Sequence, residues 1–116
     1  MWSATCGDCK AQAASLGRVA RKYAGQGLAV VPLTRYYEED AAERVKEKAL
    51  VDSVWKAVYG DLGPASIPIS TESMQRWGGS STPTFAFVDR RGVVRRYTPT
   101  RLTEEALDRE VAALLR

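Results

Sequence analysis

The stretch that decides the fold is Trp2-Ser-Ala-Thr-Cys6-Gly-Asp-Cys9-Lys10, in which two cysteines stand three residues apart where an amphipathic helix begins. A sulfur at a helix N-terminus meets unpaired backbone N–H groups and the positive end of the helix dipole, and both favour a thiolate. A second sulfur one turn further along can attack a mixed disulfide formed by the first. The pattern therefore predicts an attacking thiol at Cys6 and a resolving thiol at Cys9.

The composition of the rest of the chain decides whether this cysteine pair could belong to a metal site. A Cys-x-x-Cys pair is also half of a structural zinc site, which needs a second pair of Cys or His ligands. The 116-residue chain has no histidine and no cysteine beyond Cys6 and Cys9. A zinc site within this chain is therefore not predicted, and no other metal ligand set stands out.

Composition and charge indicate an ordinary globular domain. Hydrophobic residues make up 45% of the chain and charged residues 27%, which excludes a disordered or fibrous protein. The net charge of +3 is spread over 17 basic and 14 acidic side chains, with no long run of one sign. Nucleic acid is therefore not expected as a partner. The longest apolar stretch, residues 28–33, is too short to span a bilayer.

Hydrophobic periodicity predicts alternating helices and strands. The expected elements are a helix over residues 6–24, a buried strand over 28–34, a helix that starts among the acids at 38–40 and reaches 58, a loop over 60–64, a short extended piece at 67–69, a short helix over 71–77, a hairpin of strands 84–88 and 93–97, and a helix over 103–115. This order predicts an α/β sandwich with a mixed central sheet flanked by helices, in a single domain over residues 1–116.

Two separate motifs carry a resemblance to the thioredoxin-like superfamily. The segment around Cys6 resembles that family's active-site segment, in which a tryptophan stands four residues before the first cysteine. Ser81-Thr82-Pro83-Thr84 resembles the family's cis-proline loop, and residues 85–94 resemble its terminal hairpin. The long segment over 36–69 is similar to the inserted helix of bacterial cell-envelope thiol-disulfide oxidoreductases, including the cytochrome-maturation type. The resemblance covers nearly the whole chain.

The resemblance implies a thiol-disulfide oxidoreductase, more specifically a protein disulfide reductase, that needs no cofactor. Cys6 and Cys9 would form the catalytic pair, while Trp2, Thr82 and Pro83 would bind the substrate. Thr82 would hydrogen-bond an extended substrate peptide through its backbone. The implied partners are proteins that carry disulfides or thiols, together with an upstream electron-donor protein, and the chain is expected to be a monomer.

The resemblance also implies a cellular location and a missing strand. Such relatives are usually exported or membrane-tethered, which implies a periplasmic or extracytoplasmic protein, with an anchor upstream as one arrangement and the cytoplasm as the alternative. In the family a central strand leads into the active-site helix, between the strands expected here at 28–34 and 84–88. That strand would precede Met1, so we expect an N-terminally truncated domain that lacks its N-terminal strand or strands and leaves backbone edges open.

The two residues between the cysteines, Gly7 and Asp8, are expected to tune the redox pair. A negative charge at Asp8 disfavours the Cys6 thiolate and so opposes the helix terminus. Because stabilising the thiolate makes a pair more oxidising, Asp8 is predicted to shift the pair toward the reducing end.

Two alternatives of other classes stay open. Two thiolates also suit Cu(I), so the chain could be a soft-metal carrier. Carrier loops usually have methionine two residues before the first cysteine, where this chain has Ala4, and they have no counterpart to the Thr82-Pro83 loop. The other alternative is a thioredoxin-like module that binds partners without catalysis.

Overall fold

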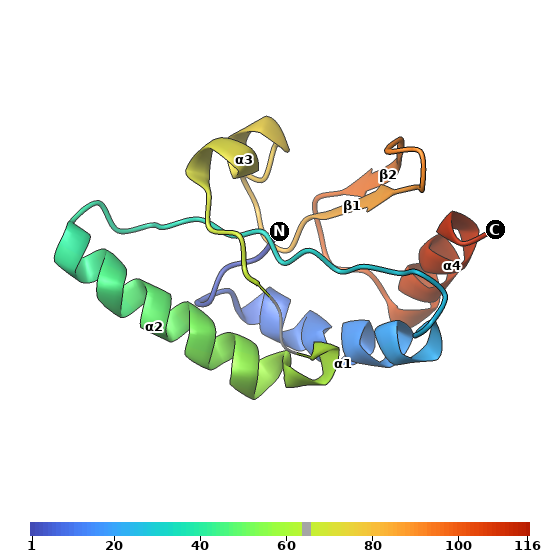
Figure 1. The fold of residues 1–116 in the computed structure, drawn as a ribbon, viewed down its shortest axis with the longest axis horizontal. Helices are drawn as coiled ribbons and strands as arrows, with labels where there is room; N and C mark the ends of the chain where they lie inside the picture. The colour runs from blue at the N-terminus through green and yellow to red at the C-terminus, as the bar shows by residue number, and fades with distance from the viewer. Residues whose placement is uncertain (64–65) are drawn as a thin grey trace.

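The helices and the hairpin follow the predicted order. The computed structural model describes residues 1–63 and 66–116, and Pro64, in the predicted loop, lies outside the described residues. The elements, shown in Figure 1, are α1 (Gly7–Lys22), α2 (Ala41–Val58), the 3-10 helix η1 (Gly60–Leu62), α3 (Thr71–Arg76), β1 (Phe85–Val88), β2 (Val94–Thr98) and α4 (Glu104–Leu114). The predicted α/β class is confirmed.

Side-chain caps explain where the three longer helices begin. The Cys6 sulfur accepts from the backbone N of Cys9 at 3.0 Å, and the Asp40 carboxylate accepts from the backbone N of Ala42 at 2.9 Å. The Thr103 hydroxyl accepts from the third residue after it in the same way. Each cap satisfies a backbone donor that the first helical turn leaves free. The caps therefore lie immediately before the helices, and Cys6 is held in place by the helix that follows it.

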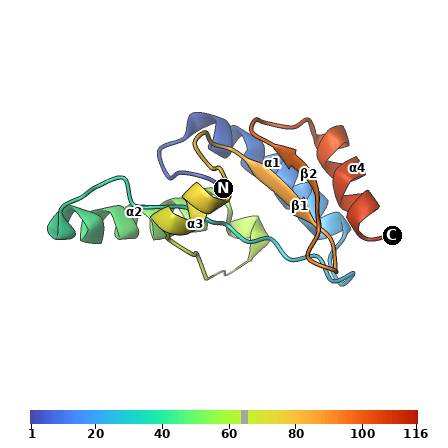
Figure 2. The same cartoon turned by 90° about the horizontal axis from the view of Figure 1, so that it is seen from above.

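The two strands form an antiparallel hairpin. Phe85 is paired with Thr98 and Phe87 with Arg96, and an irregularity in the register follows Phe87. The turn contains Gly92 at φ +81°, a left-handed conformation that glycine adopts without steric cost. Phe87 points into an apolar cluster with Val19 of α1 and two α4 side chains. This cluster holds α1 and α4 against the hairpin, an arrangement seen in Figure 2.

The prediction of a buried strand over residues 28–34 is wrong for most of that segment. The chain there is extended, but only Thr34 forms a bridge, a parallel one with Ile69. Val31 is 69% exposed. The physical reason is the lack of a neighbour: within the described residues the hydrogen-bonded sheet has only β1 and β2, so nothing pairs with the 28–32 backbone as a strand. The mixed central sheet is accordingly reduced to the hairpin and this one bridge.

An apolar slot lies where a central strand was expected. A cavity of about 520 Å³ runs between residues 28–33 and β1, and it is also lined by side chains of α1 and α4. At one end the Met1 and Thr84 backbones exchange hydrogen bonds of 2.8 and 3.1 Å, while the Trp2 N donates to the Leu33 O at 3.1 Å. The first two residues therefore bridge both walls of the slot.

Candidate redox-active site

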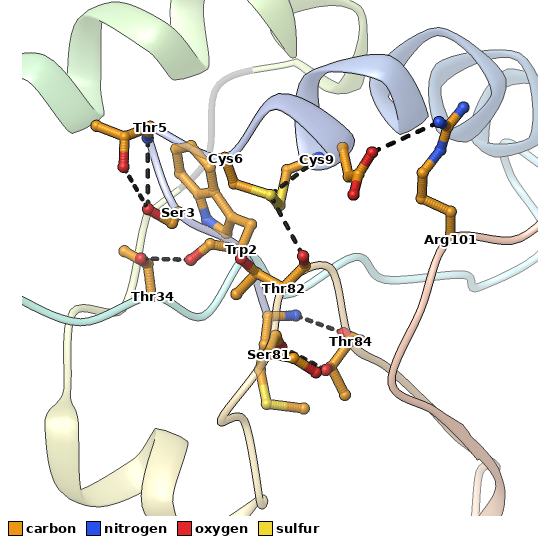
Figure 3. The surroundings of a disulfide bond; sticks show 12 residues. Trp2, Ser3, Thr5, Cys6, Cys9, Thr34, Ser81, Thr82, Thr84 and Arg101 are labelled. Carbon is orange, nitrogen blue, oxygen red and sulfur yellow. Dashed lines mark hydrogen bonds and ion pairs between the residues drawn. A yellow bond between two sulfur atoms is a disulfide. The ribbon is translucent and has the colours of Figure 1, made fainter.

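The predicted cysteine pair sits at the start of α1 and is joined by a disulfide (Figure 3). The Cα atoms of Cys6 and Cys9 are 5.2 Å apart. Their environments differ: Cys6 is half-buried at the rim, whereas Cys9 is 1% exposed. Cys6 is therefore the more accessible residue of the disulfide, and Cys9 is the buried one.

The Thr82-Pro83 loop forms the wall opposite Cys6. The carbonyl oxygen of Thr82 lies 3.4 Å from the Cys6 Sγ, and the Thr82-Pro83 peptide bond is cis. Thr84 holds the loop in shape, because its hydroxyl donates to the Ser81 carbonyl at 2.6 Å. Two predicted site segments that are far apart in the sequence thus meet at one sulfur. Pro83 is buried, Thr82 is half-buried and Ser81 is exposed.

Trp2 is placed differently from what substrate binding requires. Its side chain is 5% exposed, and its indole Nε1 donates to the Pro32 carbonyl at 2.9 Å. Its ring packs against Trp55 and Tyr59 of the α2 region, with centroids 5.8 and 5.1 Å away. Burying the large indole satisfies its N–H and covers apolar surface. Trp2 therefore packs in the buried cluster that contains Cys9. The predicted role of Trp2 in binding the substrate is not supported by this buried position.

An aromatic cluster under the disulfide was not predicted as part of the site. Trp55 and Tyr59 stack with centroids 5.1 Å apart and belong to the same buried cluster as Cys9. Burial raises the pKa of Tyr59 to about 12, so its phenol stays neutral at physiological pH. The available signal was the spacing of Trp55 and Tyr59 by one helical turn, which places both rings on one face. The cluster gives Cys9 apolar surroundings.

The polar side of the site contains Asp8 and an arginine that sequence reasoning missed. Asp8 is exposed, and its Oδ1 lies 3.6 Å from the Nη1 of Arg101, which comes from the segment between β2 and α4 (Figure 3). No local pattern links the two residues, because they meet only through the fold. Gly7 is exposed, and a side chain there would meet no atom within 4 Å. Packing therefore does not require glycine at this position.

A second, smaller cavity lies between the segment before Cys6 and α2. It has a volume of about 310 Å³ and lies between Ser3, Thr5, the residues after Thr34 and the first half of α2. Charged side chains of both signs line it, including Arg35 and Glu47. Thr5, the residue before Cys6, lines this cavity, whereas neither cysteine does.

Across residues 1–63 and 66–116, no three side chains of the ligating types converge on a point that could hold a metal ion. Within the same described ranges, no helix combines the length and apolar character needed to cross a bilayer.

The chain is similar in structure to a solved protein. The crystal structure of a Chlorobium tepidum protein named as a thiol:disulfide interchange protein, DsbE, matches with a TM-score of 0.74 over 99% of this chain and 76% of that chain, at 20% sequence identity. The fold is thioredoxin-like. No protein-family model matches the sequence, and no curated protein matches it either. The expected fold is thus confirmed by structural similarity, at an identity that establishes the fold alone.

Proposed function

We propose that the protein is a thiol-disulfide oxidoreductase that works as a protein disulfide reductase. The observation that carries the proposal is the arrangement of two bonded cysteines of unequal exposure at the start of a helix. The half-buried Cys6 is the N-cap residue of α1, and the buried Cys9 stands one turn further along the helix. The Chlorobium tepidum protein of similar structure is named as a thiol:disulfide interchange protein, which supports disulfide exchange here.

The geometry supports a defined sequence of steps. In the reduced protein the Cys6 thiolate attacks a substrate disulfide, which releases one substrate thiolate and leaves a mixed disulfide. The Cys9 sulfur, deprotonated as it attacks, then displaces the second substrate thiolate from the Cys6 sulfur and forms the Cys6–Cys9 disulfide. Two electrons pass from the protein to the substrate, and the released thiolates take up protons from solvent. A dithiol donor protein would restore the reduced pair by the reverse exchange.

The walls of the site are suited to a peptide substrate. Thr82 is half-buried beside Cys6, so its backbone could pair with an extended segment on either side of the substrate cysteine. The cavity beside Thr5 gives room for a neighbouring substrate side chain. Pro83 would shape this wall, and Gly7 would keep the rim over the sulfur uncovered.

Asp8 supports the reducing direction of the reaction. Asp8 stands between the two cysteines in the sequence and its side chain is exposed, so its negative charge raises the free energy of a thiolate at Cys6. A less stable thiolate makes the disulfide harder to reduce, and the pair a stronger reductant.

The setting of the reaction is proposed from the resemblance. We place the protein in an extracytoplasmic compartment, the periplasm in a bacterium, where disulfide exchange between proteins is common. It would act as a monomer on protein thiols and disulfides, with a second protein as its electron donor. No role for nucleic acid is proposed.

The reduction of insulin disulfides tests the function. With dithiothreitol as electron donor, the protein should accelerate insulin reduction, and Cys6→Ser should lower the rate to the uncatalysed level. Cys9→Ser should instead accumulate a mixed disulfide between Cys6 and substrate, because the resolving sulfur is missing. Full activity of Cys6→Ser would contradict the proposal. Inactivity of the unaltered protein, together with tight Cu(I) binding by both sulfurs, would favour the metal carrier.

A further inference from the structure

The side chain of a buried glutamine on α1 forms hydrogen bonds with the backbone of the segment that follows β2. Gln12 stands one turn after Cys9 and is 3% exposed. Its amide Nε2 donates to the Leu102 carbonyl at 3.0 Å, and the Leu102 N donates to its Oε1 at 2.8 Å. The Nε2 also donates to the Ser15 hydroxyl at 2.7 Å. A buried amide is costly unless it is hydrogen-bonded, and here both of its ends are satisfied.

The two hydrogen bonds between Gln12 and Leu102 also fix the position of Arg101, the residue before Leu102. Because both backbone groups of Leu102 are tied to α1, the residue before it is held beside the first turn of the same helix. Arg101 extends from there toward Asp8, with the Nη1 3.6 Å from the carboxylate Oδ1. The guanidinium is about half exposed, as is typical of a surface ion pair. The clamp formed by Gln12 and Leu102 thus brings a positive charge to the cysteine motif.

We propose that Arg101 is a positioning residue for the redox pair, held by the clamp of Gln12 and Leu102 so that it offsets the effect of Asp8 on the Cys6 thiolate. The proposal deepens the proposed function and rests on it only in taking Cys6 as the attacking thiol. Asp8 alone would disfavour the thiolate, and Arg101 restores part of the stability that the helix N-terminus provides. The reductant strength of the pair then depends on a contact between two distant parts of the chain.

The size of the effect follows from the exposure of the pair. Exposed ion pairs are weak, so removing Arg101 should lower the thiolate fraction of Cys6 about two- to fivefold at low salt. In 1 M salt the Debye length is only about 3 Å, so electrostatic interactions beyond that distance are screened. At that salt concentration the effect of removing Arg101 on the thiolate fraction of Cys6 should largely disappear. A purely structural role of Arg101 would not show this dependence on salt.

The test measures the ionisation of Cys6 without any substrate. The variants are Arg101→Gln, Asp8→Asn, the double variant, and Arg109→Gln, which removes the same charge from an exposed position on α4. For each reduced protein the rate of Cys6 alkylation by iodoacetamide is recorded against pH, and the equilibrium with glutathione is measured alongside.

We expect Arg101→Gln to move the ionisation of Cys6 to higher pH and to make the disulfide harder to reduce. Asp8→Asn should move both quantities the opposite way. In the Asp8→Asn background the effect of Arg101→Gln should fall to less than half, because Arg101 loses the carboxylate that orients it. An Arg101→Gln effect no larger than that of Arg109→Gln, or equal in the Asp8→Asn background, would overturn the proposal.

Two further outcomes separate this inference from the proposed function. If the ionisation shifts as expected while insulin is not reduced, the inference stands and the function fails. If insulin is reduced while Arg101→Gln leaves the ionisation of Cys6 unchanged, the function stands and the inference fails. Gln12→Ala should reproduce the Arg101→Gln shift, provided that circular dichroism shows a folded protein. Arg101→Gln is the decisive variant, because the Arg101 side chain is exposed and its replacement should leave the fold intact.

Discussion

At the scale of single residues, Cys9 belongs both to the site and to the core. Its side chain is almost fully buried in the cluster that contains Trp2, Trp55 and Tyr59. Burial in apolar surroundings disfavours a thiolate, whereas Cys6 keeps access to solvent and to the helix N-terminus. The spacing of the two cysteines predicted Cys6 as the attacking thiol and Cys9 as the resolving thiol, and this order stays a prediction.

The first prediction concerns the aromatic cluster below Cys9. Trp55→Ala should lower the free energy of unfolding of the oxidised protein by about 3–5 kcal/mol, because it removes a large ring from a packed cluster. Equilibrium unfolding in urea measures this loss. Trp77→Ala is the matched control, since Trp77 is 41% exposed, and it should cost much less. Equal costs for the two substitutions would show that the cluster does not support the site.

At the scale of elements, the helices and the hairpin were predictable because their signals are local. Apolar periodicity, caps such as Asp40 and the Asp-Arg-Arg-Gly turn act over a few neighbouring residues. The hairpin turn is an example. The Asp89 carboxylate accepts from the backbone N of Arg91 and of Val93 at 2.9 and 3.0 Å, and from the Arg95 Nε at 2.6 Å. These bonds were not predicted individually, although the turn was.

The second prediction is a dependence of the hairpin on pH. The backbone N–H of Val93, followed by Arg95 and Arg91, holds the pKa of Asp89 below its usual value. The contribution of the Asp89 carboxylate to the free energy of unfolding is therefore fully present above about pH 4, where the carboxyl is also ionised in the unfolded chain. This contribution is lost as the pH falls through the lower pKa of Asp89 in the folded protein. Asp89→Asn should lower stability at pH 7 and flatten the loss of stability on acidification below pH 4.

Urea unfolding at a series of pH values measures this effect. Glu105→Gln, at an exposed position on α4, is the control for removing a carboxyl. If Asp89→Asn loses stability below pH 4 as steeply as the unaltered protein does, Asp89 is not the source of the pH dependence.

At the scale of the whole molecule, the slot is the feature that the elements alone do not explain. Residues 28–33 form one wall, β1 forms the other, and both present apolar side chains. Met1 and Trp2 connect the two walls through backbone hydrogen bonds, in the manner of the end of a strand. Within the described residues, no strand of the hydrogen-bonded sheet lies between these two walls.

The third prediction tests what the slot can accept. A strand-forming sequence of Val, Ile and Thr residues joined to Met1 should raise the midpoint of thermal unfolding by at least about 5 °C. The added strand would pair with the free backbone edges and cover apolar surface. A Gly/Ser extension of equal length is the control. If both extensions give the same midpoint, the slot does not accept a strand.

The sequence by itself determined where the helices, the hairpin and the cysteine pair lie in this protein. The spacing of Cys6 and Cys9 at a helix start, and the Thr82-Pro83 turn before a hairpin, are patterns that neighbouring residues enforce. Only the tertiary structure decided that Trp2 lies beneath the disulfide, that Gln12 holds Leu102, and that Arg101 reaches Asp8. It also decided that residues 28–32 stay unpaired. Such contacts depend on which distant segments pack together, and no local periodicity encodes that choice.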